Sequence, residues 1–138
     1  MKLNRCDDVY WKALENLIST KKIVVDRKTG SRHPRYPEYV YPVDYGYIEG
    51  LKSSDSNDMD VWVGTSKQKT INGVLCTIDN FKNDVEIKIL ISCMKNEIEA
   101  IYDKMNEGTM NAICILRQGK LDSLSCKIEY EDKGGVSK

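Results

Sequence analysis

Two stretches of the chain have the hydrophobic spacing of an amphipathic helix. In residues 7–20 and in residues 94–106, apolar side chains recur every three or four positions and would share one buried face. Asp7 or Asp8 can cap the first helix, and Gly108 is placed to end the second. The apolar positions are Trp11, Leu14, Leu17 and Ile18 in the first stretch and Met94, Ile98, Ile101 and Met105 in the second.

Alternation of apolar and polar residues predicts strands in much of the remaining chain. Residues 84–91 are the clearest case, because Asp84, Glu86 and Lys88 fall on one face and aliphatic residues on the other. Residues 36–48 contain two prolines, which favours an edge strand or an extended wall. The predicted strands cover residues 22–26, 36–48, 59–64, 71–79, 84–91 and 110–116, with a weaker signal over residues 124–130.

The order of these elements lacks the strand–helix alternation of a parallel sheet. We expect a mainly β fold of the α+β class, a small antiparallel OB-like barrel with two flanking helices. A chain of 138 residues can bury one core, and no linker or repeat divides it, so we expect a single domain over residues 1–138. Residues 131–138 are expected to be frayed.

Composition and charge argue against several classes of function. Twenty-one basic residues balance twenty-one acidic ones, so net charge gives no support to binding of nucleic acid or of a membrane surface. No stretch is apolar enough for a signal peptide or a membrane span. One histidine, and five cysteines without a CxxC pair, argue against structural zinc and for a reducing cytoplasmic location.

The polar chemistry of the chain is concentrated in residues 32–64. Five of the eight tyrosines lie within residues 36–47, and the carboxylates of Asp55, Asp58 and Asp60 follow. Carboxylate oxygens are ligands that suit Mg²⁺ or Mn²⁺, and bound cations relieve the repulsion among gathered acids. Further candidate ligands are Asp79, Asp84 and Glu86.

Cationic and phenolic side chains offer the complementary equipment for binding phosphate. Arginine matches phosphate oxygens in bidentate geometry, and lysine or tyrosine can add single hydrogen bonds. No GxxxxGK[ST] loop, GxGxxG turn or GxSxG elbow is present, so a nucleotide-binding loop and a serine nucleophile are not supported. The candidate phosphate ligands are Arg32, Arg35, Lys88 and Tyr45.

Two linked motifs carry a resemblance to a known family. Residues 41–48 read YPVDYGYI and residues 55–61 read DSNDMDV. They resemble the YPxNYGYI and DGDPxDV motifs of the soluble inorganic pyrophosphatases with an OB-like barrel, and the gap between the motifs is the same. Residues 30–36, 79–88 and 102–104 are similar to that family's GSRxKY segment, to its later metal acid with a DxK pair, and to its YKD motif.

The resemblance implies an enzyme that hydrolyses pyrophosphate, or a small phosphoanhydride, with Mg²⁺ or Mn²⁺ and an activated water, and that can form homo-oligomers. Apolar side chains such as Trp62 could then serve an interface between copies. Asp60 would bind metal and help the water to lose its proton, and Asn57 stands where the family has the aspartate tied to activating that water. By carry-over, Asp55, Asp60, Asp79 and Glu86 would bind metal, and Tyr45, Arg35, Lys88 and Tyr102 would hold phosphate.

Other departures from the family pattern change individual assignments. Asp26 replaces a glutamate and becomes a candidate metal ligand. The segment after residue 35 is shortened, so Arg32 would stand in for a missing arginine. Asp84 and Glu86 compete for one ligand position, and Lys104 would serve as the second phosphate-binding lysine because Asp103 occupies that position.

Two alternatives remain open at this point. Because an amide cannot take a proton, Asn57 is also compatible with an impaired module that binds metal and phosphate or nucleotide without turnover. An OB-type nucleic-acid binder would use the tyrosines as stacking platforms, but the acidic cluster and the neutral net charge argue against it.

Overall fold

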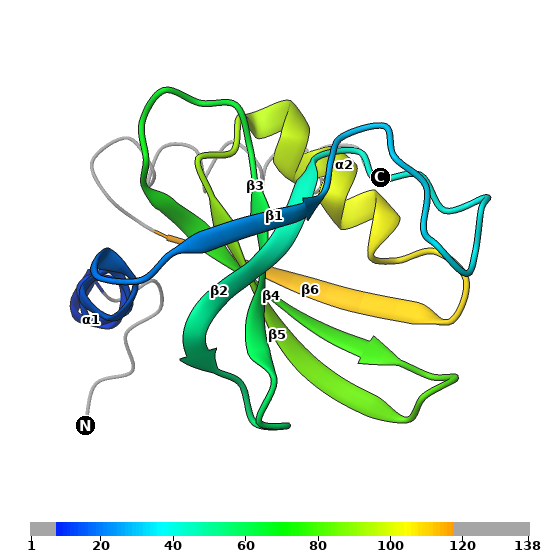
Figure 1. Cartoon of the computed structure of the whole chain (residues 1–138), viewed down its shortest axis with the longest axis horizontal. Helices are drawn as coiled ribbons and strands as arrows, with labels where there is room; N and C mark the ends of the chain where they lie inside the picture. Colours follow the sequence, from blue (N-terminus) through cyan, green and yellow to red (C-terminus); the bar gives the residue numbers. More distant parts are fainter. Residues whose placement is uncertain (1–7, 118–138) are drawn as a thin grey trace, which may run out of the picture.

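The computed structural model describes residues 8–117 as a sheet with two helices (Figure 1). The helices are α1 (Asp8–Ser19) and α2 (Lys95–Lys104). The strands are β1 (Ile23–Arg27), β2 (Asp44–Lys52), β3 (Asp58–Val63), β4 (Ile71–Asp79), β5 (Asp84–Ile91) and β6 (Met110–Leu116). These bounds agree closely with the predicted helices and with most predicted strands, whereas residues 124–130 and 131–138 lie outside the described range.

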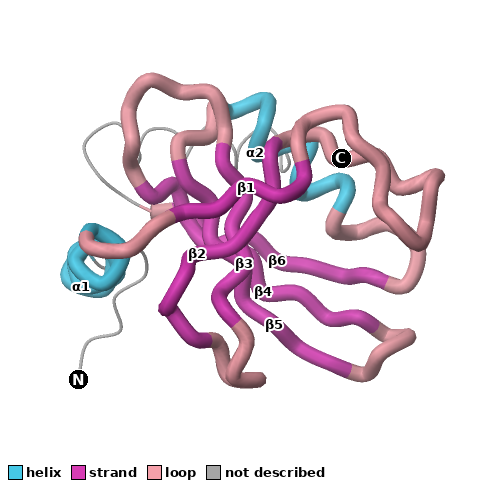
Figure 2. The backbone as a smooth tube through the Cα atoms, viewed as in Figure 1, coloured by secondary structure: helices cyan, strands magenta, loops and turns pink. Residues whose placement is uncertain are grey.

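The sheet is mixed, with the order β1-β2-β3-β5-β4-β6 (Figure 2). Neighbouring strands are antiparallel except for β3 and β5, which run parallel because β4 lies on the far side of β5. The prediction of a mainly β fold with two flanking helices is confirmed. Two details differ from the expected small antiparallel OB-like barrel: the β3–β5 pair is parallel, and the described strands form a sheet that is not closed.

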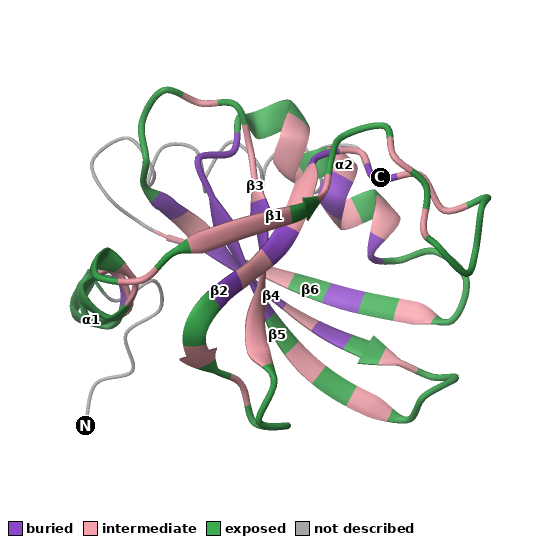
Figure 3. Ribbon diagram, viewed as in Figure 1, coloured by how far each residue is buried: buried purple, intermediate pink, exposed green. Residues whose placement is uncertain are grey.

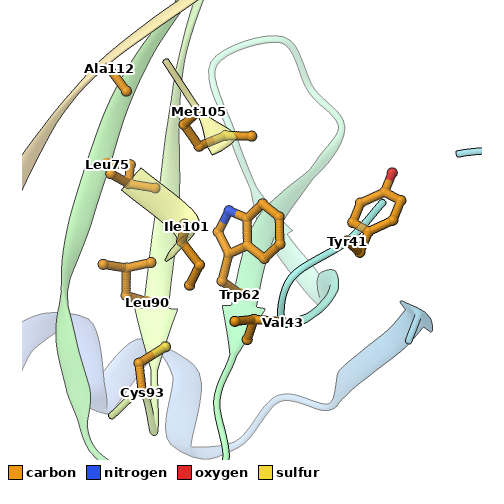
Figure 4. Close-up of a cluster of buried hydrophobic side chains, with 9 residues drawn as sticks. All are labelled: Tyr41, Val43, Trp62, Leu75, Leu90, Cys93, Ile101, Met105 and Ala112. Atoms are coloured by element: carbon orange, nitrogen blue, oxygen red, sulfur yellow. The ribbon is translucent and has the colours of Figure 1, made fainter. Parts of the chain in front are cut away.

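Both faces of the sheet carry a hydrophobic cluster, because alternate residues of the central strands point to opposite sides. On one face, Trp62 and Leu90 pack with Ile101 and Met105 at α2 (Figure 4). On the other face, Val61, Ile48 and Ile89 pack with Trp11 of α1. Figure 3 shows that buried positions are concentrated in the middle of the sheet.

The position of Trp62 corrects one expectation from the sequence. Its side chain would have been available for an oligomer interface if it lay on the surface. Trp62 is instead 0% exposed and contacts the rings of Tyr41 and Tyr45, with centroid distances of 6.1 and 4.5 Å. It is therefore part of the core that supports the polar site described below.

Residues 28–43 form a loop between β1 and β2. The predicted strand over residues 36–48 is therefore wrong in its first half. Within this loop, only Arg32 and Val40 form a β-bridge, and regular pairing begins at Asp44. The prolines explain this difference, because proline has no amide hydrogen to donate to a strand. Arg32 Nη1 also donates a hydrogen bond to the Pro37 carbonyl at 2.7 Å, which closes the loop on itself.

Gly46 lies where β1 crosses β2 at very short range. A methyl group added to Gly46 would lie 1.8 Å from the carbonyl oxygen of Val24. A glycine within a strand indicates a bulge or a close backbone approach, and at Gly46 the structure has the close approach. The register between β1 and β2 shifts between Val25 and Arg27, immediately beside this contact.

Replacing Gly46 by alanine should lower the free energy of unfolding by about 3 kcal/mol, because the obstructing atoms belong to the backbone of β1 and cannot move aside. Urea unfolding would measure the change. Gly30→Ala is the matched control, since Gly30 has a φ of +85° but no atom near the added methyl group. Its cost should be about 1 kcal/mol from backbone strain alone. Equal costs at the two positions would show that the crossing is not tight.

No helix within residues 8–117 is long and apolar enough to cross a membrane.

Candidate active site

Lys88 is the centre of a polar cluster at one end of the α2-side core. Its ammonium group donates hydrogen bonds to Asp60 Oδ2 at 2.7 Å, Glu86 Oε1 at 3.0 Å and the Tyr45 hydroxyl at 3.0 Å. Three acceptors match the three hydrogens of an ammonium group. Lys88 is only 6% exposed, so this arrangement is fixed by packing as well as by charge.

Strand pairing brings these four residues together from distant parts of the sequence. Asp60 of β3 lies directly opposite Lys88 of β5 in the parallel pair. Glu86 shares the face of Lys88 because it is two residues away on the same strand. Tyr45 of β2 reaches the same group, with its ring centroid 5.5 Å from the Lys88 nitrogen.

The protonation states in this cluster follow from burial and from the neighbouring charges. Burial alone would lower the pKa of Lys88, but its Tyr45 and Asp60 partners outweigh burial and raise that pKa above the ordinary value. Burial raises the pKa of the Tyr45 phenol, against the opposing effect of Lys88. Lys88 is therefore a cation and Tyr45 a neutral phenol at neutral pH.

A small pocket of about 80 Å³ adjoins the cluster on its acidic side. Asp60 and Glu86 form one wall, and the loop between β2 and β3 forms the other. The pocket therefore has several carboxylates and no lysine or arginine in its lining. Its lining residues are Ser53, Asp55, Asn57, Asp58, Asp60, Glu86 and Ile87.

Asp55 organises the loop wall of this pocket. Its carboxylate accepts hydrogen bonds from the Ser53 hydroxyl, from the Asn57 backbone amide at 3.0 Å and from the Asn57 side-chain amide at 3.1 Å. These donors, led by the Ser53 hydroxyl, hold the pKa of Asp55 below its ordinary value. Asn57 thus serves as a donor to Asp55 here, a role that an aspartate at this position could not fill with its side chain.

Ser53 lines the pocket without having been among the candidate site residues, and Asp58, which the sequence placed in the acidic cluster, lines it too. Asp58 accepts hydrogen bonds from Lys52 Nζ at 2.9 Å and from the Gly50 amide at 3.3 Å. The Lys52 contact, the larger of the two effects, lowers the pKa of Asp58. Its place beside Asp55 and Asp60 in the sequence was a signal, but alternation along the extended segment favoured a different direction for this side chain.

Three of the carboxylates proposed as metal ligands do not line the pocket. Asp79 Oδ1 accepts hydrogen bonds from the amides of Phe81 and Lys82, at 2.9 and 3.2 Å, and so closes the turn between β4 and β5. Asp84 lies opposite Asp79 in the strand register, at the turn end of the same hairpin. Asp26 lies on β1, with its carboxylate 3.6 Å from Arg27 Nη1. Asp84 and Glu86 were candidates for the same ligand position, and of these two only Glu86 lines the pocket.

The candidate phosphate ligands also separate into groups. Lys88 and Tyr45 belong to the cluster, whereas the Arg32 guanidinium is bonded to the loop carbonyl of Pro37 and Arg35 lies on the exposed part of that loop. Lys104, at the end of α2, contacts Glu107 at 3.0 Å and lies 4.7 Å from the centre of the Tyr39 ring. Tyr102 packs against the α2-side hydrophobic cluster.

The carboxylates of the pocket fit a hard divalent cation such as Mg²⁺ only if a bound phosphate compound supplies further oxygen ligands. Among residues 8–117, no three histidine, cysteine or carboxylate side chains are grouped closely enough to hold a metal ion by themselves. Mg²⁺ commonly uses one or two protein carboxylates together with phosphate oxygens and water. Asp55, Asp60 and Glu86 supply such carboxylates around one pocket, so the residues fit this second type of site.

A search of solved structures finds similar folds among bacterial inorganic pyrophosphatases. The enzyme from Neisseria gonorrhoeae superposes with a TM-score of 0.56 at 17% identity, over 80% of this chain and 90% of that one. This chain has a pyrophosphatase-type fold. The pyrophosphatases from Coxiella burnetii and Helicobacter pylori also match, each with a TM-score of 0.48 at 14% identity. Coverage is 73% of this chain and 86% of the Coxiella chain, and 78% of this chain and 88% of the Helicobacter chain.

The pyrophosphatase-type fold is visible in the arrangement of the chain and not in overall sequence similarity. No protein-family model matches this sequence, and no curated protein matches it. At 17% identity, the likeness to the Neisseria structure establishes the fold alone. Assignment of an activity therefore depends on the chemistry of the Lys88 cluster and the adjoining pocket.

Proposed function

We propose that this protein hydrolyses inorganic pyrophosphate, or a small phosphoanhydride, to phosphate in a reaction that requires Mg²⁺ or Mn²⁺. The observation that carries the proposal is the cluster of Lys88, Asp60, Glu86 and Tyr45 beside an acidic pocket. The Lys88 ammonium, which can bind phosphate, lies within 3.0 Å of two carboxylates that can bind metal, and the Tyr45 phenol lies 3.0 Å from the same ammonium. The pyrophosphatase-type fold makes this reaction the first one to test.

The charge of the site accounts for the expected metal dependence. Asp60 and Glu86 place two carboxylates around the single ammonium of Lys88, and Asp55 and Asp58 add negative charge across the pocket. These carboxylates would repel a pyrophosphate anion unless a bound divalent cation made the charge of the pocket positive. When bound, Mg²⁺ would lower the pKa of a water molecule and neutralise charge on the phosphate groups.

The protein side chains would then bind, orient and exchange a proton. Asp55, Asp60 and Glu86 would hold the cation. The Lys88 ammonium would contact the phosphate in place of one of its three present acceptors, and the Tyr45 hydroxyl would contact it as well. Lys104 and Arg35 are further candidate phosphate ligands. Water oxygen bonds to one phosphorus atom as the bridging P–O bond breaks, and Asp60 accepts the proton of the water.

Release of phosphate from pyrophosphate by the purified full chain tests this proposal. Turnover is expected with Mg²⁺, and none is expected with EDTA. A preparation of Asp60→Asn, purified in the same way, controls for contaminating enzymes. Equal phosphate release by the two preparations, or no Mg²⁺-dependent release by the natural sequence, would rule the activity out.

A second candidate function is a module that binds metal and phosphate or nucleotide without turnover. The observation in its favour is Asn57, whose side-chain amide is used as a donor to Asp55 and has no proton-accepting group. Calorimetry that detected phosphate binding by a protein with no hydrolytic activity would support this candidate over the first.

Replacing Asn57 by aspartate separates the two candidates. The variant loses the 3.1 Å hydrogen bond to Asp55 and places two carboxylates side by side in the loop. If the natural sequence is an active enzyme built around this amide, we expect kcat/KM for pyrophosphate to fall about tenfold. A rise in activity would instead identify an impaired enzyme, in which the amide had replaced a catalytic acid.

A further inference from the structure

One face of the strands β4, β5 and β6 carries a group of exposed aliphatic side chains near the β4–β5 turn. Five of them are 40–67% exposed, and the half-buried thiol of Cys76 lies among them. We call these six residues the apolar face: Cys76, Ile78, Val85, Ile87, Ile113 and Ile115. Single apolar side chains are common on protein surfaces, but a contiguous group of this kind marks an interaction site.

The strand register places the six side chains on a single side of the sheet. Cys76 of β4 lies opposite Ile87 of β5 and also opposite Ile113 of β6. Each of the other three residues is two positions away from one of these along the same strand, and residues two apart point to the same side. Figure 3 shows the resulting alternation of exposed and less exposed positions along β6. The apolar face is therefore one continuous surface.

The apolar face continues the hydrophobic cluster that packs against α1. Val74 and Ile89 belong to that cluster and lie opposite each other, each two residues before or after a member of the apolar face. Trp11 of α1 belongs to the same cluster and is only 2% exposed. The inner part of this side of the sheet is thus covered, whereas the part toward the β4–β5 turn has the same kinds of side chain and is exposed.

The last described residue is held on the side of the sheet that carries the apolar face. β6 ends at Leu116, and the Arg117 amide donates a hydrogen bond to the Asn72 carbonyl at 2.7 Å. The Arg117 guanidinium donates to Glu15 Oε2 at 2.6 Å and to Asp8 Oδ1 at 3.3 Å, and both acceptors belong to α1. Because α1 packs on that side, the chain continues from there.

The sequence that follows has a pattern complementary to the apolar face. Residues 118–138 lie outside the described range, and within them apolar residues recur at every second position over residues 124–130. In an extended segment these side chains would share one side and the polar ones the other. The apolar positions are Leu124, Cys126, Ile128 and Tyr130, and the polar ones are Ser125, Lys127 and Glu129.

The length of this part of the chain is sufficient to reach the whole apolar face. Residue 130 is thirteen positions beyond Arg117, a span of about 40 Å for an extended chain. β6 has seven residues and is therefore about 23 Å long, and neighbouring strands lie about 4.8 Å apart. The segment can therefore turn back and cross all three strands.

We propose that residues 124–130 of this chain bind the apolar face through their apolar side. Binding along the outer edge of β6 alone would leave Val85 and Ile87 of β5 exposed, so we place the segment across the three strands. Ile87 also lines the acidic pocket, and the bound segment would therefore reach the border of the candidate active site.

Alkylation of Cys76 in the full chain tests the proposal, because this thiol lies at the centre of the apolar face. Maleimide labelling followed by peptide mass spectrometry gives a rate for each cysteine. We expect Cys76 to react slowly in the natural sequence and about tenfold faster in a Leu124→Asp, Ile128→Asp double variant, which places two charges on the apolar side of the segment. Cys93, which is 6% exposed in the α2-side cluster, should stay slow in both proteins and so shows that the fold is intact.

The matched control is a Ser123→Asp, Ser125→Asp double variant. It adds the same charge at positions that alternate with the apolar ones, so Cys76 should react as slowly as in the natural sequence. A fast reaction of Cys76 in the natural sequence, or a rate that the Leu124→Asp, Ile128→Asp variant leaves unchanged, would overturn the proposal. An equal acceleration in the control would reveal a general effect of charge and would overturn it too.

The same measurement distinguishes residues 124–130 from a second copy of the chain as the occupant of the apolar face. Protection by a segment of the same chain is intramolecular, so the rate at Cys76 should be equal at low and high protein concentration. A rate that falls as the concentration rises would assign the apolar face to a dimer and reject the proposal. Phosphate release plays no part in these readouts, so their outcome is independent of the proposed hydrolysis of pyrophosphate.

Discussion

Replacing Lys88 by methionine is expected to lower kcat/KM for pyrophosphate by a factor of about 10²–10³. The side chain keeps most of its length, but the cation that contacts Asp60, Glu86 and Tyr45 is lost. A preorganised cation at the developing phosphate charge has no replacement within the cluster. Phosphate release at several pyrophosphate concentrations would separate the effects on kcat and KM.

The same substitution should also lower the free energy of unfolding, by about 1–3 kcal/mol. Breaking a fully buried ion pair costs about 3–5 kcal/mol, but the side chains of Asp60 and Glu86 are each 33% exposed and remain partly solvated. Lys12→Met is the matched control, because Lys12 pairs with Asp8 at the exposed surface of α1. Unchanged pyrophosphate hydrolysis in Lys88→Met would contradict the role assigned to the cluster.

Replacing Asp60 by asparagine is expected to lower kcat by a factor of about 10²–10⁴. Asparagine has nearly the same shape, and its carbonyl oxygen can still accept the 2.7 Å hydrogen bond from Lys88. The proton acceptor and one negative charge of the pocket are lost, so the concentration of Mg²⁺ needed for half-maximal activity should rise as well.

The control for this substitution is Asp103→Asn, which removes an exposed carboxylate from α2, outside the pocket. Activity and Mg²⁺ dependence should both be retained in that variant. If Asp103→Asn and Asp60→Asn lost activity to the same extent, the loss would reflect general charge and not the position of Asp60 beside Lys88.

The helices and strands of this fold were predictable where the apolar residues recur with one clear spacing, either that of a helix or that of a strand. Strand β6 was predicted with its exact bounds, and the β4–β5 hairpin follows from two alternating runs around a turn. The parallel pairing of β3 with β5 was not predictable, because it depends on β4 lying outside β5 and leaves no local pattern. The burial of Trp62 was missed for a related reason, since the central strands are covered on both faces.

The candidate site was predictable in part. Asp60, Glu86, Lys88 and Tyr45 were named from their motifs, and the structure brings these four together, while their catalytic roles stay predictions. Asp79 was grouped with them through its resemblance to the family's later metal acid, and its role as a ligand stays a prediction. In the structure its carboxylate accepts hydrogen bonds from the turn amides of Phe81 and Lys82, a local contact that aspartate commonly makes in turns.

The central claim is that the acidic pocket beside Lys88 holds a divalent cation against phosphate. Crystals of the protein grown with Mn²⁺ and methylenediphosphonate would test it through the anomalous signal of manganese. The account predicts an anomalous peak bound by Asp60 and Glu86, with a phosphonate oxygen in contact with Lys88. A crystal in which the ligand is bound but manganese is absent from this pocket, or lies at Asp79 and Asp84 instead, would contradict it.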